Sequence, residues 1–461
     1  MSITVIQQAY KKQSSPSALT TFVAPVYTPA VFVVESTQSG QINYRFLADI
    51  YINGLLKTRL KFSPNSASKG IVDVSNILID FSNAQILGYD SGAVSGSSKK
   101  SNVSSNLVPH SIHQIDKFSR NENVMIDWEV KFGEEYQLTS ASNPIIYDGK
   151  GVAGIPAVTG GFYQSWNSTL WQFDSLMYDF ASYSNYILDA GSKQLMTKLN
   201  STTKRKVRLD DYHTFAMFNG TDRNNEQSRP DRMNVRTYDE SGTQLQLFQV
   251  TNTDVNGGSP YSSSQDNGTE NFLFVGAGPK NFENQGNTIS ASATYYTIQF
   301  VQGGAGKSTI YTFEIDNCND STETFKSYRL AWLNSLGGFD YYNFEMKNES
   351  SFDFERQTYQ KTIGTWQQAS YFFQQSERGT TDFNVNSRQK LRLNSDWIID
   401  EEVEMMKELF MSPAVFMLED ENVFPVNVQS TNFIEYKQKE DKVFQYELEV
   451  SFSNKYKVQN G

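Results

Sequence analysis

An alternation of apolar and polar residues with a period of two is the feature that most constrains what this chain can fold into. Tyr44, Phe46, Ala48, Ile50 and Ile52 fall on one parity, which is the pattern of a strand that buries one face. Asn53-Gly54 follows at once, and both of these residues tolerate the positive φ of a type I′ turn. The sequence therefore predicts a β-hairpin whose return strand covers residues 56–62.

Short alternating segments recur between turn-rich loops along the rest of the chain. The expected strands cover residues 124–137, 234–239, 245–250, 295–301, 309–315, 390–393, 414–418, 423–429 and 443–452. This spacing of strands and turns is typical of β-sandwiches. The predicted fold class is mainly β, with β-sandwich-like domains and a C-terminal sheet module that packs against one α-helix.

Helical spacing occurs in two segments. Residues 71–81 place Val74, Ile77, Leu78 and Phe81 on one side of a short helix. A second helix is expected to begin at Asp400 as N-cap, with Glu401 and Glu402 near the positive end of its dipole, and to end at Ser412-Pro413. Its inward stripe is formed by Val403, Met406, Leu409 and Phe410.

The length predicts several domains, because 461 residues are too many for one ordinary core. We expect an N-terminal β-sandwich-like domain over residues 1–145. A central β-rich domain over 146–345 begins with a connector rich in Gly and Pro, and a strand-helix-strand module covers 346–461.

Composition and charge exclude some classes of function. The chain has 40 basic and 51 acidic residues and a formal charge of −11, whereas a protein that grips nucleic acid through its phosphates needs a surplus of Lys and Arg. Aromatic residues make up 14% of the chain, which suits a folded protein with large interfaces. A surface that grips duplex DNA is therefore not expected.

Cysteine and histidine are too scarce for most metal or triad chemistry. Cys318 is the only cysteine, and the three histidines are His110, His113 and His213. His110 and His113 could meet on one helical turn, but no third ligand lies nearby in the sequence. We expect neither enzymatic activity nor a metal or cofactor.

Export and membrane insertion are not expected either. The N-terminal segment carries Lys11 and Lys12 after its short apolar stretch, unlike a secretory signal. The most apolar stretch, residues 22–34, is too short to span a bilayer and contains Pro25 and Pro29. These features predict synthesis in a cytoplasm and no contact with a membrane.

Residues 301–308, VQGGAGKS, resemble a phosphate-binding loop whose first glycine is replaced by Val301. Such a loop joins a strand to a helix that holds phosphate at its N-terminus. Here residues 309–315 alternate like a strand and mirror residues 295–300. A hairpin turn at Gly303–Gly306 is the simpler interpretation.

Two kinds of charged cluster leave other functions open. Pairs of carboxylates could serve as acid and base in glycoside cleavage, and they occur at Asp127/Glu129, Asp210/Asp211 and Glu401/Glu402. One compact basic run could follow a phosphate chain beside Tyr212 or form a solvated edge, and it consists of Lys204, Arg205, Lys206 and Arg208.

Three stretches of the sequence resemble a family of virion proteins. Residues 29–36 and 44–54, with Gly70-Ile-Val-Asp-Val74 after them, are similar to the opening of structural proteins from tailed phages of Bacteroidetes hosts, including crAss-like phages, and from uncultured marine phages. Residues 329–344 match their Trp-Leu-Asn-x-x-Gly-Gly-x-Asp-Tyr pattern. The C-terminal part, from Leu393 onward, is similar to their last module.

The resemblance implies a structural component of the virion, assembled as a homo-oligomeric ring in the tail or head-to-tail neck. Its partners would be copies of itself and adjacent tail or neck proteins. The C-terminal arrangement is also similar to the module with which tail-tube and distal-tail proteins form rings. Candidate residues for a subunit interface, or for a structural motif with a tight turn, are Trp332, Asn334, Gly337, Gly338, Tyr341 and Phe344.

Three other functions stay open beside this one. One is a stopper that contacts DNA through the basic run at Lys204, Arg205 and Lys206. A baseplate protein that binds a receptor or glycan would use exposed aromatics such as Tyr163, Trp166 and Trp171. A glycan-cleaving tail enzyme would use one of the carboxylate pairs.

Overall fold

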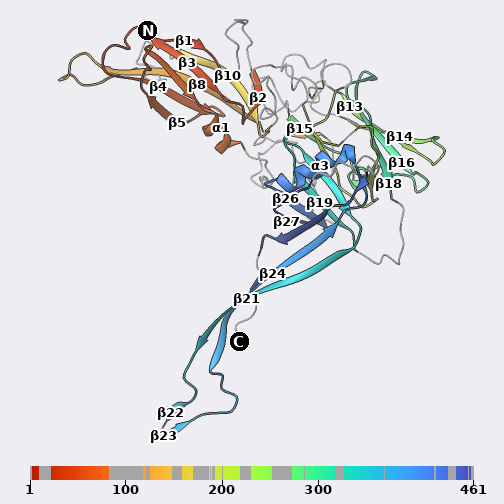
Figure 1. Cartoon of the computed structure of the whole chain (residues 1–461). Coiled ribbons are helices and arrows are strands. Elements are labelled where there is room, and N and C mark those ends of the chain that lie inside the picture. Colours follow the sequence, from red (N-terminus) through yellow and green to blue (C-terminus); the bar gives the residue numbers. More distant parts are fainter. Residues whose placement is uncertain are drawn as a thin grey trace. The chain divides into compact units, whose positions relative to one another are not determined.

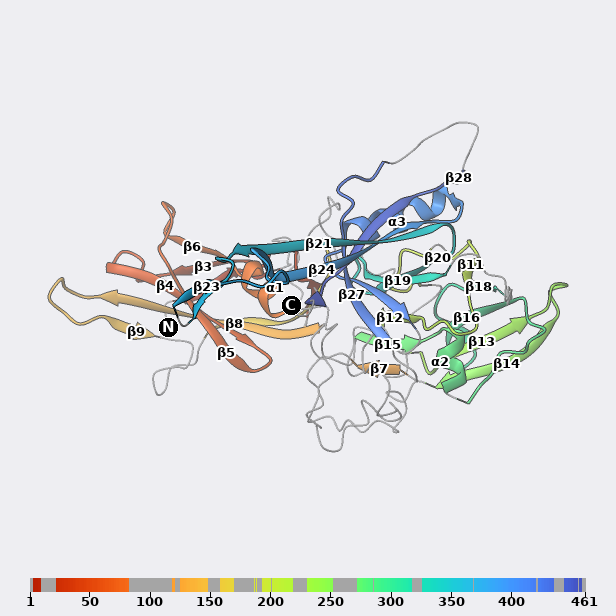
Figure 2. The same ribbon diagram turned by 90° about the horizontal axis from the view of Figure 1, so that it is seen from below.

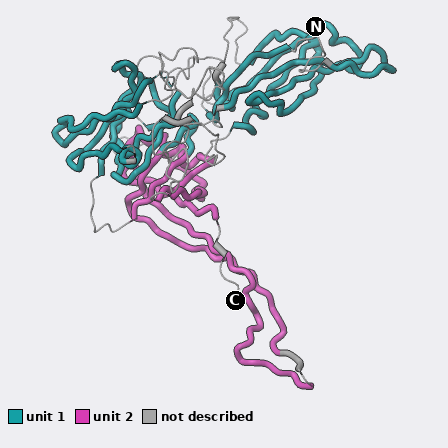
Figure 3. Tube along the Cα trace, turned by 180° about the vertical axis from the view of Figure 1, so that it is seen from behind, with its two compact units in different colours: residues 1–318, 333–340 teal, residues 319–332, 341–461 magenta. Residues whose placement is uncertain are grey.

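The protein is described here from a computed structural model. It covers residues 3–9, 22–82, 118–120, 125–147, 158–169, 186, 188, 193–199, 201–218, 230–251, 272–284, 286–316, 326–367, 369–419, 422–434, 443–454 and 456–457. The chain forms two compact units, drawn in different colours in Figure 3. Unit 1 comprises residues 1–318 and 333–340, and unit 2 comprises residues 319–332 and 341–461.

Strands dominate both units, so the predicted mainly β fold is confirmed. The described residues contain only three helices, which are α1 (Ser75–Phe81), α2 (Pro279–Asn284) and α3 (Asp400–Met411). Hydrophobic side chains are gathered into cores between the sheets and beneath α3.

The N-terminal part of unit 1 is a pair of sheets. The larger has the order β2-β10-β8-β4-β5, with β9 beside β8, and its strands are β2 (Phe22–Pro25), β4 (Ile42–Ile52), β5 (Leu55–Phe62), β8 (Met125–Gln137), β9 (Ile145–Tyr147) and β10 (Val158–Trp166). The smaller has the order β1-β3-β6, with β1 (Ile3–Gln7), β3 (Val31–Ser36) and β6 (Lys69–Asp73). Phe32 of β3 packs edge-on against Trp128 and Phe132 of β8, so the two sheets share one core.

The predicted hairpin at the start of this region is confirmed. Asn53 and Gly54 link β4 to β5 with φ values of 51° and 75°, as a type I′ turn requires. The helix expected over residues 71–81 was wrong at its beginning. Ile71 and Val72 pair with β3, so these residues form a strand and α1 begins only at Ser75.

The central part of unit 1 also has two sheets over one core. One has the order β11-β18-β16-β13-β14 (Figure 2), and β17 pairs with β16 beside this path. Its strands are β11 (Arg205–Val207), β13 (Arg232–Tyr238), β14 (Gln244–Thr251), β16 (Tyr295–Gln302), β17 (Ala305–Gly306) and β18 (Tyr311–Ile315). The other has the order β12-β15-β7, with β7 (Phe118–Arg120), β12 (Thr214–Phe218) and β15 (Phe272–Gly276). Phe215 and Phe313 join the two across the core.

Unit 2 is one large sheet covered by α3. Its order is β20-β19-β26-β27-β29-β24-β21, with β30 beside β24. The strands are β19 (Tyr328–Leu333), β20 (Phe339–Phe344), β21 (Asn348–Gln360), β24 (Thr380–Asn394), β26 (Val415–Glu419), β27 (Asn422–Val428), β29 (Glu447–Phe452) and β30 (Tyr456–Lys457). Two short pairs accompany it, namely β22 (Thr365–Gln367) with β23 (Ser370–Phe372), and β25 (Ile398–Ile399) with β28 (Val443–Phe444).

The predicted inward stripe of α3 is largely confirmed, because Val403, Met406 and Leu409 lie in the core of unit 2. Phe410 is only partly buried and packs against Phe433. The predicted N-cap was wrong, because Ile399 occupies that position without a side-chain hydrogen bond and Asp400 is the first helical residue. Ile399 pairs with Val443 in β25. Asp400, Glu401 and Glu402 all lie in the first turn of α3, where their negative charge is favourable to the helix dipole.

The sheets also define where the structural regions meet. The N-terminal sheet runs past residue 145, because β10 pairs with both β8 and β2. The sheet of unit 2 includes β19 and β20, which precede residue 346. The hairpin that carries the Trp-Leu-Asn pattern therefore contributes strands to unit 2, while its tip, residues 333–340, belongs to unit 1.

Candidate assembly surface

A long hairpin leaves the body of unit 2, and we call residues 348–394 the arm (Figure 1). Its strands β21 and β24 pair antiparallel from Asn348↔Leu393 to Gln360↔Thr380. On the other side of β24, pairing with β29 and β30 reaches no farther than Asn386 among the described residues. Beyond that point the arm is a ribbon of two strands, which ends in β22 and β23.

One face of the arm is aromatic and exposed. Phe352 and Phe354 alternate on β21, their rings are stacked with centroids 6.4 Å apart, and 51% and 60% of their surfaces are exposed. Gln389 and Ser387 lie opposite them on β24, and toward the body of unit 2 the same face of β24 continues as Leu391 and Leu393, which are buried in its core. The apolar stripe of the sheet therefore extends onto the arm, where the described part of the chain does not cover it.

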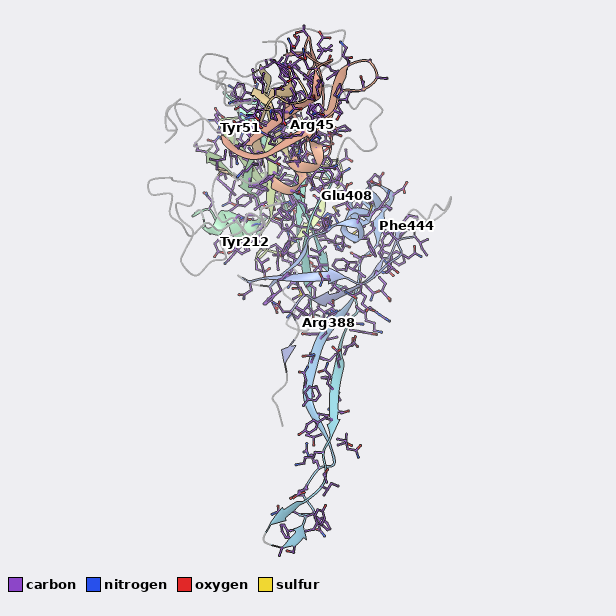
Figure 4. The ribbon with its side chains drawn as sticks, turned by 90° about the vertical axis from the view of Figure 1, so that its left-hand side faces the viewer. Arg45, Tyr51, Tyr212, Arg388, Glu408 and Phe444 are labelled. Carbon is purple, nitrogen blue, oxygen red and sulfur yellow. The ribbon has the colours of Figure 1, made fainter. Side chains whose placement is uncertain are left out.

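Aromatic side chains are also exposed farther along the arm. Tyr359 and Phe383 pack edge-on, and Tyr371 and Phe373 lie with ring centroids 6.3 Å apart. Each of these four side chains is exposed to about half of its surface. Side chains stand out from both faces of the arm, and Arg388 lies near its root (Figure 4).

The opposite face of the arm carries charge at its root. Lys390 bridges Asp353, with 2.8 Å between Nζ and the carboxylate, and Glu449 of β29 at 3.5 Å. The hydrogen bond and charge of Asp353 raise the pKa of Lys390. Lys347 likewise lowers the pKa of Glu349 by hydrogen bond and charge. These pairs are largely exposed, so they contribute little to stability.

An isolated ribbon of two strands is at best marginally stable in water. A contiguous exposed apolar patch on a soluble protein commonly marks a site of protein contact. The arm combines both features, with a face rich in the aromatic side chains that interfaces favour. Such a surface is chemically suited to contact with another protein.

The Trp-Leu-Asn pattern predicted as an interface or structural motif lies inside the protein. Trp332, Tyr341 and Phe344 are each no more than 2% exposed. Arg329 lies over the ring of Tyr341 at 5.1 Å and donates a hydrogen bond to Asn343. These aromatic surfaces are therefore used within the chain.

Asn334 organises the turn at the tip of this hairpin. Its Oδ1 accepts hydrogen bonds from the amides of Leu336 and Gly338 at 3.0 Å each. Its Nδ2 donates to the carbonyl oxygen of Met196 and to Asp340. Gly337 has a φ of +90°, and a Cβ on Gly338 would overlap the Met196 carbonyl. The two glycines are thus required by a tight turn and a close approach of backbones.

The predicted basic run lies on and beside β11, which forms an edge of the central sheet. Arg205 is buried, whereas Lys204 and Lys206 are exposed. Lys204 lies over the ring of Tyr295 at 4.6 Å, and Arg208 is 3.9 Å from Asp210. The run is therefore divided between the inside and the outside of the sheet and does not form one continuous cationic surface.

The loop that resembles a phosphate site is a hairpin, as predicted. Gly303 and Gly304 have φ values of 54° and 92° and connect β16 to β17, and β18 then pairs with β16. His213 is buried against Phe215, while His110, His113 and Cys318 lie outside the described residues. In the part of the chain that the structure describes, no cluster of three or more His, Cys, Asp or Glu could hold a metal ion.

The carboxylate pairs predicted as a possible acid and base lie in contacts or elements of the fold itself. Asp127 accepts a hydrogen bond from Gln164, and Glu129 pairs with Lys131 at 2.9 Å. Asp211 is buried and accepts the amide of Arg208. The third pair, Glu401 and Glu402, lies in the first turn of α3.

Two of the three aromatic residues that would favour glycan binding are buried, whereas glycan binding needs them exposed. Tyr163 is 1% exposed and stacks on Trp128. Trp166 is fully buried and donates its indole hydrogen bond to the carbonyl of Leu336. Trp171 lies outside the described residues.

Comparison with known proteins adds no assignment to this geometry. No protein-family model matches the chain, and no curated protein matches it. No helix among the described residues is long and apolar enough to cross a membrane.

Proposed function

We propose that this chain is a structural subunit of a tailed-phage virion, and that copies of it assemble into a ring in the tail or the neck. The resemblance of its opening, its Trp-Leu-Asn pattern and its C-terminal module to phage structural proteins supports the virion assignment. The arm supports the assembly assignment, and it is the observation on which the proposal chiefly rests.

A cyclic ring joins each subunit to two neighbours through two different surfaces. The arm can supply one of these surfaces, because Phe352 and Phe354 are exposed on it and do not belong to the core of unit 2. The acidic balance of the chain suits a ring around passing DNA, since like charge keeps the duplex from sticking to the wall.

Imaging of the purified full-length protein by negative-stain electron microscopy tests this function. We expect ring-shaped particles of one rotational symmetry, and antibodies against the protein should label the tail or neck of intact virions. Label confined to the capsid shell, or absent from virions, would contradict the assignment.

The glycan-binding and glycan-cleaving functions can each be tested with the purified protein and host polysaccharide. A glycan-binding baseplate protein would change its tryptophan fluorescence on addition of host polysaccharide, and a tail enzyme would release new sugar ends from capsule or cell wall. We expect no fluorescence change, because Tyr163 and Trp166 are buried. We expect no release of sugar ends, because Asp127, Glu129 and Asp211 make contacts within the fold. Either response, seen with protein and glycan in comparable amounts, would contradict the ring proposal and support the corresponding function.

A further inference from the structure

Among the described residues, strand β14 forms an open edge of the central sheet in unit 1, and its own sequence lacks the residues that usually protect such an edge. It pairs with β13 on one side and ends the strand order on the other. Its eight residues, QLQLFQVT, contain no charge and no proline, although natural sheets commonly use these residues to protect an edge. The edge strand β5, by contrast, carries Lys57, Arg59 and Lys61.

The outer face of β14 is apolar at two alternating positions. Leu245 and Leu247 are 38% and 49% exposed, whereas Val250 and Phe248 on the other parity pack against the core. Strand β21 ends the sheet of unit 2 and is likewise an open edge among the described strands. Phe352 and Phe354 have the same two-residue spacing on β21 that the leucines have on β14.

We propose that β21 of one copy of this chain pairs antiparallel with β14 of a second copy. Leu245 would then lie opposite Phe354, and Leu247 opposite Phe352. Backbone hydrogen bonds would satisfy both open edges, and the two apolar pairs would meet as cross-strand neighbours on one face. This inference rests on the proposed function and identifies the partner of the arm.

Charge favours a second copy as the occupant. The arm, residues 348–394, has six basic and five acidic residues, whereas the rest of the chain has 34 basic and 46 acidic residues. The arm is thus slightly positive and the rest of each copy is strongly negative, so the arm is attracted to a neighbour while the bodies resist random contact. The uncharged β14 sets no like charge against Asp353 or Glu355.

The two edges differ, so the contact is heterologous. Each copy would donate β21 to one neighbour and accept an arm on its own β14, and repetition of such a contact closes a ring or continues as a filament. A symmetric pair of copies would instead need the same surface on both partners.

Cysteine cross-linking tests the pairing and its register in the full-length protein. The variant carries Gln249→Cys and Ser350→Cys, which the proposed register places opposite each other, together with Cys318→Ser. Mild oxidation should give a ladder of covalent dimers, trimers and larger species that reducing agent removes, because every copy makes two different contacts.

The matched control combines Gln249→Cys with Gln389→Cys. Gln389 lies on the same face of the arm but on β24, one strand farther from the edge, beyond the reach of a disulfide. We expect no ladder from this variant. A ladder of equal yield from the control, or none from the test variant, would overturn the proposed register.

Single charged substitutions give a second test that does not depend on register. Leu247→Asp should weaken self-association at least about tenfold in sedimentation velocity, because the new carboxylate would be buried without a partner. Ile310→Asp is its control, since Ile310 is 48% exposed in the same unit but lies outside β14. Phe354→Asp and Trp397→Asp form the corresponding pair in unit 2, at 60% and 59% exposure.

Equal association of the Leu247→Asp and Ile310→Asp variants would refute β14 as the acceptor. If Phe354→Asp still stopped ring formation in that case, the ring proposal would stand and the arm would bind a surface other than β14. A full-length protein that stays monomeric at every concentration would exclude the pairing, while labelling of the virion would still decide the proposed function.

Discussion

Gly338 shows how a single residue distinguishes a structural motif from an interface. Its backbone lies against the carbonyl of Met196, and its amide donates to Asn334. Gly338→Ala should lower the free energy of unfolding by about 1–3 kcal/mol, because overpacked interiors cost about this much. Chemical denaturation of the purified protein measures it.

Gly40→Ala is the matched control for this prediction. No atom lies within 4 Å of a Cβ built on Gly40, so we expect a change within about 0.5 kcal/mol. A Gly338→Ala protein as stable as Gly40→Ala, but defective in self-association, would return the Trp-Leu-Asn hairpin to the role of an interface.

At the scale of elements, the arm should contribute little to the stability of the subunit. Phe354 pairs with Ser387, Glu355 pairs with Asn386, and the arm beyond them is exposed. Replacement of residues 356–385 by Asn-Gly joins Glu355 to Asn386 through a two-residue hairpin turn. The thermal midpoint should change by no more than about 2 °C, because no core side chain is removed. Circular dichroism during heating measures this midpoint. A large fall would mean that the arm contributes to the stability of the folded subunit.

The elements that the sequence predicts well are those in which local turn chemistry and burial agree. Asn53-Gly54 and Gly303-Gly304 both have the positive φ that their turns need. The arm was missed except for residues 390–393, where Leu391 and Leu393 face the core. Farther along β24 the residues are mostly polar, so period-two burial gives no signal there, and exposure of Phe352 and Phe354 depends on where the sheet ends.

Burial by tertiary packing also explains why several residues predicted for a site lie inside the protein. The Trp-Leu-Asn pattern is prominent in the sequence because a crowded turn restricts its residues, and crowding is a property of the interior. Tyr163 and Trp166 are also buried by partners far along the chain, Trp166 by the backbone near Leu336. Sequence composition predicts a protein rich in aromatic contacts, but tertiary packing decides which of these aromatics face outward.

At the scale of the whole molecule, we propose a subunit that folds by itself and then joins its own copies through the arm. The most direct test is the mass of the native protein in solution, measured by sedimentation velocity over a range of concentrations beside a variant that carries both Phe352→Asp and Phe354→Asp. We predict closed oligomers of one size for the native chain and folded monomers for the doubly substituted chain. Oligomers of the same size from both proteins would contradict this proposal.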